Sequence, residues 1–155
     1  MVEFKDYAYS IGIILTFVIG LINYRNNKKT SYINSVTAER VKWINILREN
    51  VSKYTGLTYH WVVSEIDPDS KESKEIIREL DQLNMLIRLQ INPKEDLGKK
   101  VIAHLDKIPD LTHKSYEAEL KSKLHEMVKD VQELLKEEWD KVKDEAENGR
   151  LPQKT

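Results

Sequence analysis

The four histidines are the side chains of this 155-residue chain that most readily serve as metal ligands or proton carriers. A catalytic zinc site of the His-Glu-x-x-His type needs two histidines one helical turn apart on one face. The histidines here are never closer than nine residues, and His125-Glu126 has no second histidine one turn later. The chain also lacks cysteine, which removes thiolate ligands. We therefore expect no metal site.

Motifs for nucleotide binding and acyl transfer are missing as well. The sequence has no Gly-rich loop followed by Lys-Ser or Lys-Thr, and no Gly-x-Ser-x-Gly turn. Carboxylates are frequent, but in residues 136–145 they alternate with lysines. Such mixed runs are typical of solvated helix faces with i, i+4 ion pairs. The sequence thus predicts a protein that is not an enzyme, with no catalytic residue and no cofactor.

Aromatic side chains concentrate in residues 43–61 and offer the main candidate for a binding site. The rings are those of Trp43, Tyr54, Tyr59, His60 and Trp61. Two interpretations remain open: a ligand pocket or partner-docking surface, and core packing with rings near a membrane surface, which we favour. A ligand sensor or enzyme with a pocket near Trp43 and Trp61 is a weaker hypothesis. We assign a possible partner or packing surface to Arg40, Trp43, Leu47, Trp61 and Trp139.

An uncharged run extends from Tyr7 to Tyr24, 18 residues that would form a helix about 27 Å long, close to the thickness of a bilayer core. We predict one transmembrane helix within a membrane anchor of residues 1–29. A cleaved signal peptide is disfavoured because the basic residues follow the run, and a buried soluble helix because the remaining chain is too polar to surround it. The predicted membrane-flanking residues are Tyr7, Tyr24, Arg25, Lys28 and Lys29.

Charge divides along the chain and indicates an orientation. Residues 25–66 hold seven basic and three acidic side chains, a net charge of +4, whereas residues 67–155 hold 17 basic and 21 acidic ones, a net charge of -4. The positive-inside rule then places the N-terminus outside and the rest in the cytoplasm, as a single-pass protein of the cell membrane. The basic part can lie near anionic lipid headgroups. Basic residues are too dispersed to predict nucleic-acid binding.

Residues 30–148 read as a cytoplasmic helical domain, followed by a disordered tail of residues 149–155. Apolar side chains recur every three or four residues in 31–66, with a kink or early end near Gly56, and in 71–91 after a turn at residues 67–70. A third helix starts at an Asn92 cap with Glu95 reaching back, and Pro109 stops it.

The last helix carries its apolar stripe from Tyr116 to Ala146, after a polar connection, and ends before Gly149. We predict an all-α fold in which the transmembrane helix is followed by a small antiparallel helical bundle or coiled coil of about four helices.

Three segments of the chain, together with the short anchor, resemble a group of uncharacterised small bacterial proteins. They are SYINSVTAERVKWINILRENVSKY, LIRLQINPKEDLGKKVIAHLDKI and LLKEEWDKVKDEAE. The resemblance covers most of the chain, and its most recognisable residues are Arg40, Trp43, Ile44, Leu47, Arg48, Asn92, Pro93, Trp139 and Lys143. It implies one N-terminal span, a helical cytoplasmic part, and an association with phage defence or mobile elements. It implies no catalytic residues.

Two functions follow as hypotheses. The first is a non-enzymatic, membrane-anchored helical scaffold or adaptor that self-associates or holds a cytoplasmic partner at the inner membrane face. The alternative is a membrane-perturbing effector of a bacterial phage-defence system, activated when the cytoplasmic part oligomerises. In both, the expected partners are the lipid bilayer and a second copy or another protein, and not nucleic acid.

Overall fold

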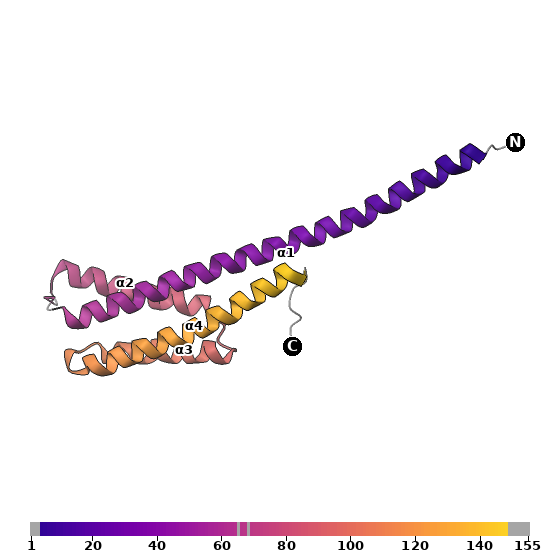
Figure 1. Ribbon diagram of the computed structural model, residues 1–155. Coiled ribbons are helices and arrows are strands. Elements are labelled where there is room, and N and C mark those ends of the chain that lie inside the picture. The colour runs from indigo at the N-terminus through magenta and orange to yellow at the C-terminus, as the bar shows by residue number, and fades with distance from the viewer. Residues whose placement is uncertain (1–3, 65, 68, 149–155) are drawn as a thin grey trace. The chain divides into compact units, whose positions relative to one another are not determined.

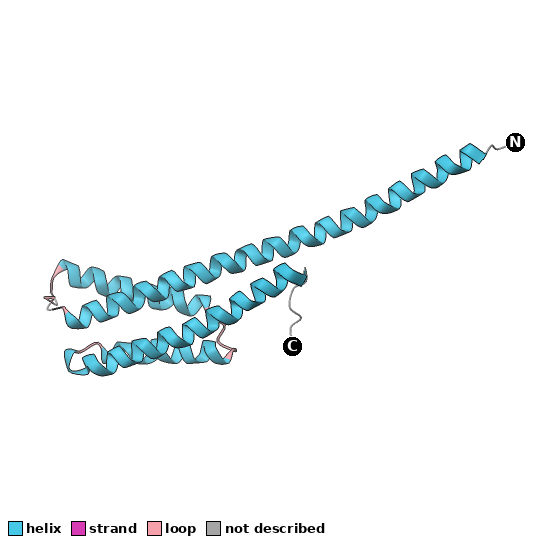
Figure 2. Ribbon diagram, in the orientation of Figure 1, coloured by secondary structure: helices cyan, strands magenta, loops and turns pink. Residues whose placement is uncertain are grey.

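Helices make up nearly all of the chain that the computed structural model describes, which is residues 4–64, 66–67 and 69–148. The α-helices are α1 (Phe4–Val63), α2 (Lys71–Gln90), α3 (Asp96–Lys107) and α4 (Glu117–Asn148), and two short 3-10 turns, η1 (Ile108–Leu111) and η2 (Lys114–Tyr116), lie before α4. Figure 2 shows the short loops that join them, and no strand occurs in the described ranges. The predicted all-α, bundle-like fold is confirmed. The predicted tail, residues 149–155, lies outside the described residues.

The chain divides into two compact units, residues 40–142 and residues 1–39 with 143–155. The first unit, called here the bundle, contains all of α2 and α3 and parts of α1 and α4. Its core is a continuous cluster of apolar, mostly aliphatic side chains contributed by all four helices and η1. Leu47, Ile87, Leu105, Ile108 and Met127 are its fully buried centre, each 0% exposed. Burial of these one-sided apolar stripes is what holds such helices in place.

Helix α1 is one continuous element of 60 residues, whereas the sequence suggested an anchor helix and a separate helix over 31–66 with a break near Gly56. The linking residues 25–33 contain neither Gly nor Pro, so nothing in them stops a helix. At Gly56 the helix simply continues to Val63. The helix therefore has no early end near Gly56, and the described part has four α-helices in all because the anchor and the first bundle helix are the same element.

The start of α3 also differs from its expected cap. The Asn92 Oδ1 accepts from the backbone N–H of Lys94 at 3.1 Å, and its side-chain amide donates to Glu95 at 2.9 Å. These contacts form a turn ahead of the helix, which begins at Asp96 with Glu95 as its N-cap and no side-chain capping bond. The α2 start follows expectation, since Ser70 Oγ accepts from the Ser73 N–H at 3.0 Å.

Gly98, in the first turn of α3, lies close to the backbone that precedes the helix, and it provides a first prediction. A Cβ at this position would lie 2.1 Å from the Asn92 carbonyl oxygen, so only glycine permits this approach of backbone to helix. We expect Gly98→Ala to lower the free energy of unfolding by about 2 kcal/mol or more, because backbone must move.

Gly56 is the matched control for that substitution, since a Cβ there meets nothing within 4 Å. Gly56→Ala is expected to raise stability by about 0.5–1 kcal/mol through the lower entropy of the unfolded chain. Chemical denaturation followed by circular dichroism measures both, and shifts of the same sign would contradict the close approach at Gly98.

The segment before α4, predicted as a polar connection, contributes an apolar side chain to the core. The α-helix α3 ends at Lys107, just before Pro109 as predicted, and Pro109 lies within the 3-10 turn η1, whose Leu111 is buried in the core at 3% exposure. Tyr116, expected on the buried stripe, lies in η2 and is 47% exposed.

Beyond Leu135, the buried positions of α4 differ from the predicted stripe. The buried positions continue through Val142 to Glu145, so Trp139 is 43% exposed and Ala146 is exposed, contrary to the predicted stripe. Trp139 lies beside the buried line, which runs in steps of four, four and three through Leu134, the half-buried Glu138, Val142 and Glu145.

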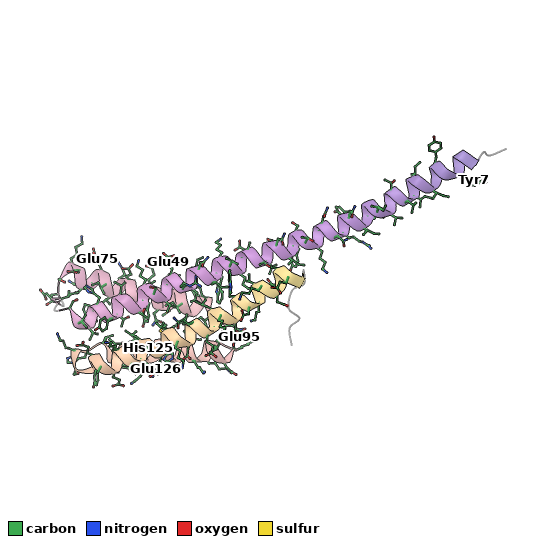
Figure 3. The ribbon with its side chains drawn as sticks, viewed as in Figure 1. Tyr7, Glu49, Glu75, Glu95, His125 and Glu126 are labelled. Carbon is green, nitrogen blue, oxygen red and sulfur yellow. The ribbon has the colours of Figure 1, made fainter. Side chains whose placement is uncertain are left out.

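The predicted anchor of residues 1–29 is only partly described: residues 1–3, and the side chains of residues 4–6, 8 and 10, lie outside the described residues. Every described side chain from Ile11 to Tyr32 is exposed. Tyr7, labelled in Figure 3 near the start of α1, is 61% exposed, and Tyr24 is 65% exposed. In the described ranges, no helix is both long and apolar enough to cross a membrane.

Candidate functional site

Among the five residues assigned to a partner or packing surface, Leu47 lies in the bundle core at 0% exposure, Trp43 and Trp61 pack against that core, and Trp139 is 43% exposed. Trp43 is partly buried, and its indole N–H donates to the Gln90 carbonyl at 2.9 Å. Gln90 is the last residue of α2, where carbonyl oxygens lack helical partners, so Trp43 satisfies the end of that helix.

Arg40 joins α1 to α4 within the bundle. Its Nη1 donates to Glu138 Oε2 at 2.9 Å, with the two side chains 21% and 17% exposed. Glu138 also pairs with Lys141. A charge-assisted bond between half-buried groups fixes helix register. In the other unit, the Thr37 hydroxyl donates to Glu145 Oε2 at 2.7 Å, and Glu145 is 1% exposed.

The histidines serve local or interhelical contacts. His104 of α3 lies 2.8 Å from Asp130 of α4, with side chains 12% and 20% exposed. His113 accepts the Ser115 N–H at its Nδ1 and so caps η2. In the ranges that the structure describes, no three residues of the metal-ligating types come together.

His125 and Glu126, the residues that begin an incomplete zinc motif, lie on α4, where Figure 3 labels them. Both are exposed. Glu126 accepts a hydrogen bond from Lys123 at 2.6 Å, which holds the pKa of its carboxyl below the usual value. The pair is therefore part of a charged helix surface.

Trp61 lines a cavity of the bundle, of about 290 Å³, between α1, α2 and η1. The apolar part of its lining comes from Trp61, Ile77, Leu80, Ile108 and Pro109. The polar part comes from Tyr54, Thr58, Asp81, Asn84 and Thr112. Trp43, which the sequence grouped with Trp61, is not among the lining residues.

A chain of hydrogen bonds positions the polar floor of this cavity. Arg88 donates from Nε to Asn84 Oδ1 at 2.7 Å and from Nη2 to Asp106 at 2.6 Å. Asn84 in turn donates its amide to the Tyr54 hydroxyl oxygen at 3.4 Å and to the Leu105 carbonyl at 3.3 Å. Tyr54 is 3% exposed, so this network fixes its hydroxyl inside the bundle.

Because of Tyr54, we expect the stability of the bundle to fall at alkaline pH. Burial raises the pKa of its hydroxyl above 10.0, against a smaller lowering by the hydrogen bond from Asn84. The folded state therefore holds this proton more tightly than the unfolded state, and stability is complete below pH 10 and falls as the pH rises above it.

We expect Tyr54→Phe to lose less stability than the wild type between pH 9 and about pH 11, because phenylalanine has no proton to release. Denaturation curves at both pH values measure the difference. At neutral pH the change should be small, about 1 kcal/mol or less, since the bond from Asn84 is long. Equal alkaline losses in the two proteins would contradict the buried hydroxyl.

The cavity suits binding better than bond-breaking chemistry. Its groups are an apolar wall, a fixed phenol and amide, one carboxylate, and two threonine hydroxyls that donate to backbone carbonyls rather than to a base. Sequence reasoning found Trp61 and Tyr54 but missed Asn84 and Arg88, whose only signal is polar side chains next to the buried stripe of α2. Comparison of the chain with protein-family models, with curated proteins and with solved structures finds no match.

Proposed function

We propose that the protein is a membrane-anchored helical scaffold in which residues 7–24 of α1 insert into the bilayer, the N-terminus lies outside, and the bundle lies in the cytoplasm. One observation carries this proposal. Nine large apolar side chains between Ile11 and Ile22 are each 44–71% exposed, so the chain itself does not bury them. A contiguous apolar surface of this kind needs a membrane or another protein to cover it.

The arrangement of these side chains favours lipid as the cover. At about 100° per residue, the nine positions spread over about two thirds of the helix circumference. A partner docked along one side would cover a single stripe, as the bundle does for α2 and α4, and would leave the others in water. A bilayer surrounds the helix and buries all of them.

The flanks supply the boundaries and the orientation of the proposed span. Tyr7 and Tyr24 stand at its two ends, where a ring can lie at the headgroups, and Arg25, Lys28 and Lys29 follow it. The proposal concerns the complete run, including positions 8 and 10, whose side chains are outside the described residues.

Self-association is the scaffolding activity that this helix supports. The remaining third of its circumference carries Gly12, Thr16 and Gly20, spaced four residues apart. A Cβ at either glycine would meet nothing within 4 Å, so this narrow face is open. Transmembrane helices approach one another closely along such faces of small residues. A second copy of α1 is thus the partner proposed within the bilayer.

Chemical crosslinking in membranes tests the scaffold. The full chain is expected to give crosslinked dimers or larger oligomers, and Gly12→Leu with Gly20→Leu to reduce them strongly because the added side chains separate the helices. Ile14→Leu, on the opposite face, is the matched control and should leave crosslinking unchanged. Absence of oligomers from the wild type would remove the proposal.

A second measurement in the same cells, that of the membrane potential, distinguishes the scaffold from the membrane-perturbing effector. A scaffold is expected to leave the membrane potential unchanged on expression. Collapse of the potential would favour the effector.

A further inference from the structure

The proposed scaffold does not use the cavity beside Trp61. The side chains that line this cavity indicate which class of ligand it would bind. We propose that it binds a small organic cation, an amine carried on an apolar body, with the body against Trp61 and the ammonium group at Asp81. The site lies wholly within the bundle, so this proposal does not depend on the membrane anchor.

The volume and walls of the cavity set the size of the ligand. The cavity volume of about 290 Å³ is just below the range for ligand pockets, which begins near 300 Å³, so only a small ligand fits. Ile77, Leu80 and Ile108 give an apolar lining, and Trp61 adds a partly buried aromatic ring. A body of one aromatic ring or a short branched chain fits this space.

The charges select a cation over an anion. Asp81 is an exposed residue of the lining, and no ion pair or hydrogen bond to its carboxylate is found in the described part of the chain. Arg88, the cation of the neighbouring network, is engaged by Asn84 and Asp106. The charges of Arg88 and Asp81 both act on the buried hydroxyl of Tyr54, that of Arg88 more strongly. Arg88 is paired with Asp106, however, whereas Asp81 has no cation beside it in the described residues. An ammonium group would gain attraction from this carboxylate and from an aromatic face, whereas a carboxylate ligand would be repelled.

Three ligands of one shape and different charge test the proposal. The full chain in nanodiscs is titrated with phenethylamine, 2-phenylethanol and phenylacetate while tryptophan fluorescence is recorded, and empty nanodiscs correct for partition into lipid. We expect saturable binding of phenethylamine, about fivefold weaker binding of 2-phenylethanol, and weaker binding still of phenylacetate, because a partly exposed charge pair contributes modestly.

Two variants assign that preference to the cavity. Asp81→Asn keeps the size of the side chain and should reduce phenethylamine affinity about fivefold while leaving 2-phenylethanol unchanged. Asp110→Asn is the control, because Asp110 is an exposed carboxylate next to lining residue Pro109 but does not line the cavity. Ile77→Trp, at a position 43% exposed, fills the cavity and should abolish binding without unfolding the bundle.

Several outcomes would overturn the cation site. They are no saturable binding of any ligand, equal affinity for all three, equal effects of Asp81→Asn and Asp110→Asn, or binding that survives Ile77→Trp. Circular dichroism of each variant separates loss of the ligand from loss of the fold.

Discussion

Lysine at both Ile14 and Phe17 is expected to move the full chain from the membrane pellet to the soluble fraction. Both side chains lie near the middle of the proposed span and are 62% and 67% exposed in the chain alone, so the substitutions leave the bundle core intact. A lysine at the centre of a transmembrane helix is about 3 kcal/mol less favourable than an apolar residue, or about 6 kcal/mol for two. Ultracentrifugation of lysates with immunoblotting measures the distribution.

Met85→Lys is the matched control for the added charge. Met85 is an apolar side chain of α2 that is 61% exposed, but it lies in the bundle and outside the proposed span. We expect this variant to stay in the pellet with the wild type. Retention of the double-lysine variant, or release of Met85→Lys, would show that residues 7–24 do not hold the protein at the membrane.

Leu47→Ala is expected to lower the free energy of unfolding of the bundle by about 2–5 kcal/mol, since it removes a fully buried side chain and leaves a cavity. Leu47 is 0% exposed and belongs to the core cluster shared by all four helices. A loss of this size is a large share of the stability of a small domain.

Ile46 offers an adjacent control on the same helix. It is 38% exposed, and Ile46→Ala should cost about 1 kcal/mol or less. Chemical denaturation of both variants, monitored by circular dichroism, gives the comparison. Equal losses of stability in the two variants would contradict the assignment of Leu47 to core packing. If Leu47→Ala were as stable as the wild type, Leu47 would again be a candidate for partner binding.

Helix α2 shows how much of the fold follows from the sequence. Of the predicted stripe, Ile76, Leu83, Ile87 and Ile91 are buried and Leu80 is partly buried. Steps of three and four residues place side chains on one face whatever the helix packs against, so the pattern alone identifies the face. The break at residues 67–70 was equally readable, because Ser70 can cap a helix with its own side chain.

Features that depend on contacts between residues far apart in the chain could not be predicted from the sequence. Gly98 of α3 approaches the Asn92 carbonyl closely, and Glu138 of α4 pairs with Arg40, 98 positions away. The cavity needs Tyr54, Asn84 and Ile108 from three elements at once. A periodic pattern identifies which face is buried, but it does not identify what that face meets.

The most direct test of the central claim is the accessibility of single cysteines on the two sides of the proposed span. The chain contains no cysteine, so Glu3→Cys and Ser115→Cys each introduce one labelling site. In intact cells expressing the full chain, a membrane-impermeant maleimide is expected to label position 3 and to reach position 115, an exposed residue of the bundle, only after lysis. Protection of both positions in intact cells, or labelling of position 115 before lysis, would contradict a single span with the bundle in the cytoplasm.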